Sequence, residues 1–97
     1  MERLKFSYPA RHPVARRVHV GVVGSGDLEI LLEPSPDGQA HVNINTSVEG
    51  FASVWQHVLD RFFGRFDGAA AIEINDSGAT PGVVLLRLEQ AVEALRE

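Results

Sequence analysis

The sequence predicts an α+β domain, with a mostly antiparallel sheet of about five strands and two helices packed on one face, in the order β-β-β-β-α-β-α. Apolar and polar residues alternate in four segments before residue 46, which is typical of strands with one buried face. After residue 50 the apolar spacing changes to three and four, which indicates a helix. A chain of 97 residues is close to the common domain size, so residues 1–97 are expected to form a single domain.

Five strands are expected from alternation. Glycine-containing links at residues 24–27 and 35–38 join the second strand to the third and the third to the fourth, and such links favour antiparallel hairpins. The simplest arrangement of these strands is a meander. The alternating apolar positions are Leu4, Phe6 and Tyr8; Val18, Val20 and Val22; Leu28, Ile30 and Leu32; Val42 and Ile44; and Ala70, Ile72 and Ile74.

The first helix is expected from an apolar stripe over residues 51–66 that includes Trp55. Thr46 and Glu49 have the spacing of a capping box, in which a hydroxyl and a carboxylate bond otherwise unpaired amides. Gly64 is a residue type that often ends helices. The pattern therefore predicts a helix that begins near Thr46 and ends at Gly64.

The second helix is expected to begin at Thr80. Threonine is favoured as an N-cap, and proline, here Pro81, is favoured at the first helical position. From there the helix runs toward Arg96. Its apolar stripe consists of Val84, Leu88, Ala91, Val92 and Leu95.

Composition excludes several classes of function. Nine Lys and Arg against thirteen Asp and Glu give a net charge of −4, the wrong sign for binding phosphate backbones, so no nucleic-acid partner is expected. The absence of cysteine excludes a disulfide framework, a thiolate metal site and a cysteine nucleophile. The apolar stretches are shorter than the roughly 20 residues of a spanning helix, and no apolar signal core is seen. No membrane partner is therefore expected, and the default location is the cytoplasm.

The face of the sheet opposite the helices is expected to be polar. Its histidines, His19 and His41, have carboxylates nearby in the pattern, but no close histidine spacing places two ligands on one element, so no metal site is predicted. A solvated surface and a polar subunit contact both explain this face. Its residues are Arg17, His19, Glu29, Leu31, His41, Asn43, Asn45, Glu73 and Asn75.

One serine occupies an unusual position at the expected tip of a hairpin. Ser25 lies between Gly24 and Gly26, which allow positive backbone torsions and leave its hydroxyl without bulky neighbours, as a site of covalent modification needs. A plain hairpin turn explains the same residues. The order Gly-Ser-Gly does not match the Gly-x-Ser-x-Gly motif of hydrolases, so no catalytic residue is assigned.

A second loop, residues 75–83, contains glycine and leads into the expected helix at Thr80. The free amides of a helix start can bind an anion. No lysine follows Gly82, so this is not a Walker loop. A strand-to-helix connection with a capping threonine, and a phosphate or partner contact, are both open.

These two segments, in this order and at this chain length, resemble the acyl-carrier (delta) subunit of bacterial malonate decarboxylase and, more distantly, the acyl-carrier subunit of citrate lyase. The similarity spans most of the chain. The segments that carry it are Leu4 to Pro9, Gly21 to Leu31, Asn45 to Val48, Trp55 with Asp60 and Arg61, Gly78 to Val83, and Arg87 to Gln90.

The resemblance implies that Ser25 is the attachment point of a 2′-(5″-phosphoribosyl)-3′-dephospho-coenzyme A group, joined through its hydroxyl by a phosphodiester. Malonyl and acetyl groups are then carried as thioesters on this prosthetic group. The chain would be a non-catalytic subunit of a cytoplasmic complex. Its partners would be the acyltransferase and decarboxylase subunits and, during maturation, a prosthetic-group transferase.

The resemblance also implies roles for residues near Ser25. Gly24 and Gly26 let the transferase reach the hydroxyl, and Asp27 either closes the turn or repels misplaced phosphates. Thr80 and Gly82, at the second helix start, are expected to steady the phosphates, provided that the two loops lie at the same end of the sheet.

Other classes of function remain as alternatives. A citrate lyase-type carrier is the nearest variant, and a cofactor-free adaptor that docks through its polar sheet face and loops is the main competitor. Phosphopantetheine carriers are helical bundles with the serine at a helix start, whereas Ser25 lies between expected strands. An independent enzyme that uses the histidines is a further alternative.

Overall fold

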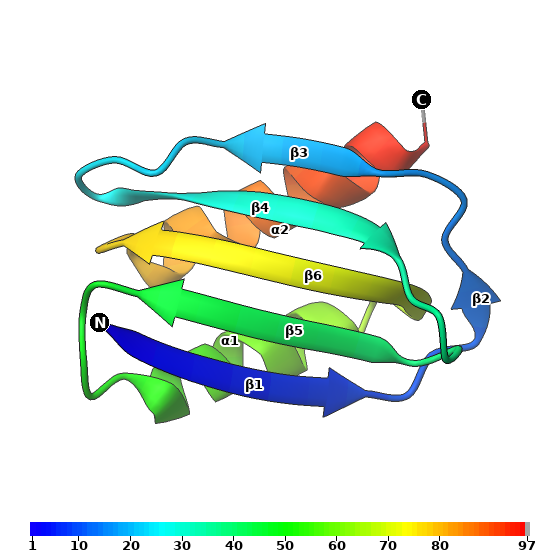
Figure 1. Cartoon of the computed structure of the whole chain (residues 1–97), viewed down its shortest axis with the longest axis horizontal. Coiled ribbons are helices and arrows are strands. Elements are labelled where there is room, and N and C mark those ends of the chain that lie inside the picture. The colour runs from blue at the N-terminus through cyan, green and yellow to red at the C-terminus, as the bar shows by residue number, and fades with distance from the viewer. Residues whose placement is uncertain (97) are drawn as a thin grey trace.

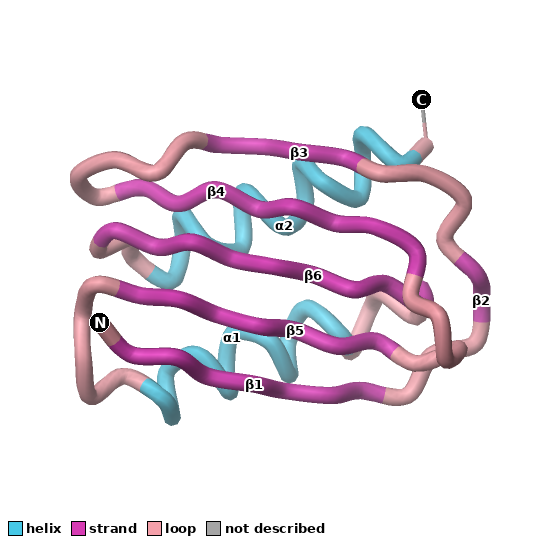
Figure 2. Tube along the Cα trace, viewed as in Figure 1, coloured by secondary structure: helices cyan, strands magenta, loops and turns pink. Residues whose placement is uncertain are grey.

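The computed structural model describes residues 1–96 and has the predicted α+β fold class (Figures 1 and 2). The predicted elements are all present, and one short strand, β2, is additional. The elements are β1 (Glu2–Tyr8), β2 (His12–Pro13), β3 (Val18–Gly21), β4 (Asp27–Pro34), β5 (Ala40–Thr46), α1 (Ala52–Phe63), β6 (Gly68–Ser77) and α2 (Pro81–Leu95).

The strands of the main sheet lie in the order β1-β5-β6-β4-β3. The β1–β5, β4–β6 and β3–β4 pairs are antiparallel, β5–β6 is parallel, and β2 pairs in parallel with the start of β6. The expected meander is therefore wrong at two points: β1 pairs with β5 and not with β3, and β6 lies between β4 and β5. The link after β4 crosses the start of β6, where the Ser35 amide donates to the Ala69 carbonyl at 3.0 Å.

Both helices cover one face of the sheet, behind it in the view of Figure 1. The strands contribute their alternate residues to the core, and each helix contributes one stripe, as predicted. The buried core consists of Leu28, Ile30, Leu32, Val42, Ile44, Ala70, Ile72 and Ile74 from the sheet, with Trp55, Val58, Leu59, Phe62, Val84, Leu88 and Ala91 from the helices.

The start of α1 differs from the prediction. The helix begins at Ala52, and Phe51 is its N-cap without a side-chain hydrogen bond. The capping box expected at Thr46 is wrong, because Thr46 ends β5 and its buried hydroxyl donates to the Asp76 carboxylate at 2.8 Å. Gly50 has a φ of +88°, a left-handed conformation that interrupts a right-handed helix.

Val22 also departs from the predicted pattern. It was expected to share the buried side of a strand with Val18 and Val20, but β3 ends at Gly21 and Val22 is 65% exposed. Gly21 has a φ of +79°, and a Cβ atom at this position would clash with the backbone oxygen of Leu28. The turn at Gly21 therefore takes Val22 out of the strand.

The other face of the sheet is polar, as predicted. Glu29 accepts hydrogen bonds from His19 at 3.0 Å and from the Asn75 amide at 2.8 Å, and Asn45 donates to Asn75 at 3.0 Å. These bonds join β3, β4, β6 and β5 across the open face. Among the positions predicted for it, Leu31 is the apolar side chain and is 38% exposed.

Candidate functional site

The β3–β4 hairpin ends in a turn whose tip is Ser25. The Asp27 amide donates to the Gly24 carbonyl at 2.9 Å, which closes a four-residue β-turn. Gly26 occupies the third position with a φ of +75°, the conformation that a type II turn requires there and that glycine adopts without strain. The glycine after the serine is therefore needed by the backbone.

The space around this turn is open. A Cβ atom on Gly24 or Gly26 would meet no heavy atom within 4 Å, so Gly24 has no packing reason to be glycine in the described chain. Ser25 is exposed, and its hydroxyl has no hydrogen-bond partner within residues 1–96. The turn thus presents one free alcohol to solvent.

Asp27 fixes the turn to the second helix. Arg87 of α2 donates to both carboxylate oxygens of Asp27, from Nε at 3.1 Å and from Nη2 at 2.7 Å. The Leu28 amide donates to Asp27 Oδ1 at 2.7 Å. These bonds, first the one from Arg87, lower the pKa of the Asp27 carboxyl below its ordinary value. Both oxygens are engaged, which favours the role of closing the turn over that of repelling phosphates.

Removing the guanidinium by Arg87→Met is expected to raise the pKa of Asp27 toward that of an ordinary aspartate. A carboxyl with a lowered folded pKa contributes stability above its unfolded pKa, and that stability is lost as the pH falls through the folded pKa. In the variant, the free energy of unfolding should therefore lose the part of its pH dependence that comes from Asp27. Carboxyl titration by NMR measures the shift of the Asp27 pKa, with Arg96→Met as a control, because Arg96 pairs with exposed Glu93. An unchanged titration of Asp27 would contradict the pairing.

The second predicted loop follows β6 and lies at the same end of the sheet as the β3–β4 turn, on the left in Figure 1. Asp27 is in register with Ser77, and the Gly26 amide donates to the Ser77 carbonyl at 2.7 Å. Through this bond, covalent geometry limits the distance between the Cα atoms of Ser25 and Gly78 to about 10 Å. The two loops therefore lie at the same end of the sheet, as the predicted role of Thr80 and Gly82 requires.

Thr80 is the N-cap of α2, as predicted. Its hydroxyl accepts a hydrogen bond from the Val83 amide at 3.3 Å, and Pro81 is the first helical residue. Gly82 is exposed, and a Cβ there would meet nothing within 4 Å. A role for Thr80 and Gly82 toward phosphates stays a prediction.

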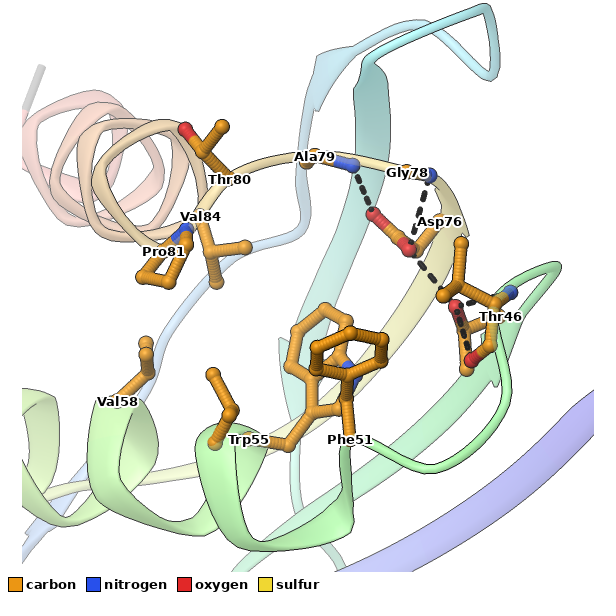
Figure 3. Close-up of a pocket in the computed structure, with 12 residues that line it drawn as sticks. Thr46, Phe51, Trp55, Val58, Asp76, Gly78, Ala79, Thr80, Pro81 and Val84 are labelled. Carbon is orange, nitrogen blue, oxygen red and sulfur yellow. Dashed lines mark hydrogen bonds between the residues drawn. The ribbon is translucent and has the colours of Figure 1, made fainter.

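Sequence reasoning missed a buried polar pair beneath this loop. The Asp76 carboxylate accepts hydrogen bonds from the Thr46 hydroxyl at 2.8 Å, the Gly78 amide at 3.1 Å and the Ala79 amide at 3.0 Å (Figure 3). An aspartate two residues before a glycine is a typical signal of such a turn. The pair ties the end of β5 to the end of β6 and fixes the loop that leads into α2.

The same end of the molecule contains a groove between the first turns of α1 and α2 (Figure 3). It has a volume of about 340 Å³. Phe51 and Val54, assigned from the sequence to the apolar stripe, are 47% and 38% exposed here. The groove is lined by Thr46, Val48, Phe51, Val54, Trp55, Val58, Asp76, Gly78, Ala79, Thr80, Pro81 and Val84.

The histidines pair elsewhere. His19 contacts Glu29, His41 contacts Asp37 at 2.7 Å, and His12 contacts Asp67 at 2.9 Å. His57 contacts the backbone oxygen of Ser53. The structure brings no histidine to the groove lining, and no base among residues 1–96 is hydrogen bonded to Ser25.

Within the described part of the chain, no helix has the length and apolar character to span a bilayer.

Known proteins match nearly the whole chain. Residues 15–95 match the family model for the malonate decarboxylase delta subunit (MdcD). A malonate decarboxylase acyl carrier protein of Azotobacter vinelandii (strain DJ) is 53% identical over 94 residues, which cover 96% of this chain and 95% of the relative. A protein of the same name from Pseudomonas fluorescens (strain Pf-5) is 53% identical over 96 residues, or 98% of this chain and 97% of the relative.

A solved structure shares the fold. In the crystal structure of a Pseudomonas malonate decarboxylase hetero-tetramer in complex with malonate, one chain matches with a TM-score of 0.93 and 53% identity. The match covers 98% of this chain and 99% of that chain. Together with the residues quoted above, these similarities show that the chain belongs to the malonate decarboxylase delta subunit family.

Proposed function

We propose that this chain is the acyl carrier subunit of a malonate decarboxylase, with a 2′-(5″-phosphoribosyl)-3′-dephospho-coenzyme A group attached to the Ser25 oxygen. The observation that carries the proposal is the free Ser25 hydroxyl at an open turn, in a chain of this family that has no cysteine of its own. The names of the relatives favour malonate over the citrate variant.

The residues around Ser25 fit a bulky covalent group. The hydroxyl is not engaged within residues 1–96, and the flanking glycines add no side chain near it. When bound, the group supplies a terminal thiol whose malonyl thioester accepts the charge left by loss of carbon dioxide better than a free carboxylate does.

The chain itself positions this group and performs no catalytic step. Ser25 supplies the oxygen of the phosphodiester. Because no base within residues 1–96 is hydrogen bonded to it, the transferase must activate this hydroxyl during maturation. Gly24 and Gly26 leave that enzyme access to the hydroxyl. The Asp27–Arg87 pair holds the turn in place, and Thr80 and Gly82 face the phosphates from the helix start.

The partners follow from the same proposal. A related chain belongs to a hetero-tetramer with malonate bound. We expect this chain to bind acyltransferase and decarboxylase subunits in a cytoplasmic complex, and to meet a prosthetic-group transferase before assembly.

Intact-mass measurement of the carrier from its native host tests the proposal. We expect a mass increase equal to one phosphoribosyl-dephospho-coenzyme A, abolished by Ser25→Ala. Ser47→Ala is the matched control, because Ser47 is also exposed and also follows a strand at this end of the sheet. An unmodified mass in an active complex would rule out the carrier role and favour a cofactor-free adaptor.

A further inference from the structure

We infer that the groove between α1 and α2 binds the adenine ring of the prosthetic group, while the pantetheine arm beyond it stays free to move. This inference rests on the proposed attachment at Ser25. It assigns a function to the groove, which takes no part in forming the phosphodiester at Ser25.

The first observation is reach. Gly78 lines the groove, and its Cα lies within about 10 Å of the Ser25 Cα, because Gly26 and Ser77 are directly hydrogen bonded. One phosphate and two ribose units separate the serine oxygen from the adenine. The adenine is therefore the ring that the tether delivers to this distance.

The second observation is an unpaired donor. Trp55 is 6% exposed, and its indole N–H has no hydrogen-bond partner within residues 1–96. Among the described residues, every completely buried side-chain nitrogen or oxygen has a hydrogen-bond partner. The unpaired indole N–H of Trp55 must therefore be accessible to solvent. Trp55 lines the groove. Buried tryptophans usually have a partner for this group. The ring nitrogens of adenine are acceptors of the required kind.

The third observation is the character of the lining. The single carboxylate in it, Asp76, is already bonded to Thr46, Gly78 and Ala79. No lysine or arginine lines the groove, so it suits an uncharged ring rather than a pyrophosphate. The half-exposed ring of Phe51 at the groove offers an aromatic face for a base to stack on.

Bound adenine would shorten the moving part of the prosthetic group. The pivot of the arm then lies at the groove and not at Ser25, and only the pantetheine travels between partner subunits. The adenosine portion acts as a fixed extension of the carrier surface.

NMR on the intact, loaded chain tests this inference, because Trp55 is the only tryptophan and gives one indole N–H signal. Loading, verified by intact mass, is expected to shift this signal. Nuclear Overhauser contacts are expected from adenine H2 or H8 to the rings of Trp55 or Phe51. Contacts from the pantetheine methyl groups instead of adenine would overturn the inference, and so would an indole signal that is the same with and without loading.

A titration separates the groove from the attachment. In a Ser25→Ala chain, 3′-dephospho-coenzyme A is expected to shift the indole signal to saturation. Adding Phe51→Ala should weaken that binding about tenfold, the effect of losing one base–aromatic stack. Leu86→Ala, at a side chain 50% exposed on α2 and outside the groove, should leave it unchanged. Equal binding in the Phe51 and Leu86 variants would overturn the inference. If the unchanged chain from its native host carries no mass adduct, the proposed function is rejected and this inference with it.

Discussion

Replacing Ser25 with alanine is expected to abolish malonate decarboxylation by the assembled complex while leaving the carrier fold intact. The Ser25 side chain is exposed and makes no hydrogen bond within residues 1–96, so its loss should change the free energy of unfolding by less than about 0.5 kcal/mol. If the prosthetic group is attached at Ser25 as proposed, loss of this oxygen leaves the complex without a thioester. The effect on turnover should therefore be complete.

Release of carbon dioxide from malonate measures this effect in complexes purified with either variant carrier. Ser47→Ala should support normal turnover. Co-purification of the other subunits with the Ser25→Ala carrier shows that assembly is retained. Normal turnover by a complex that contains only the Ser25→Ala chain would disprove the carrier role.

Replacing Trp55 with alanine is expected to lower the free energy of unfolding by about 3 to 5 kcal/mol. The ring is 6% exposed and belongs to the buried core that joins α1 to the sheet. Its removal takes away apolar contact and leaves a cavity, which neighbouring side chains fill only in part.

Urea unfolding followed by circular dichroism measures this loss, since the variant has no tryptophan fluorescence. The midpoint should fall by at least about 1 M. Val54→Ala, at the preceding and 38% exposed position, should shift it much less. Equal midpoints for the Trp55 variant and the unchanged chain would show that the ring does not pack in the core.

Much of the fold could be predicted because burial leaves a local pattern. Alternation identified the strands that bury one face, such as the one with Ile30, and spacings of three and four identified both helices. Thr80 and Pro81 located the start of α2 because capping depends on neighbouring residues. Gly24, Ser25 and Gly26 indicated an open turn, because turn formation also depends on residues that are neighbours in the sequence.

The order of the strands left no such pattern. The link at residues 35–38 has the composition of a hairpin turn, yet it spans β6, since turn residues allow a reversal without specifying which strand lies beside which. Thr46 was misassigned because the partner that fixes its hydroxyl, Asp76, is 30 positions away. The groove was missed because Phe51 fits an apolar stripe equally well whether it is covered or exposed.

The late position of β6 in the chain has a consequence for how the carrier matures. Every main-sheet strand lies on one side or the other of β6, and the serine turn is bonded to Ser77 at its end and to Arg87 beyond it. During synthesis from the N-terminus, Ser25 therefore leaves the ribosome long before the residues that hold its turn exist. A transferase that recognises the ordered turn would modify only finished chains, so folding itself would act as the checkpoint before the cofactor is committed.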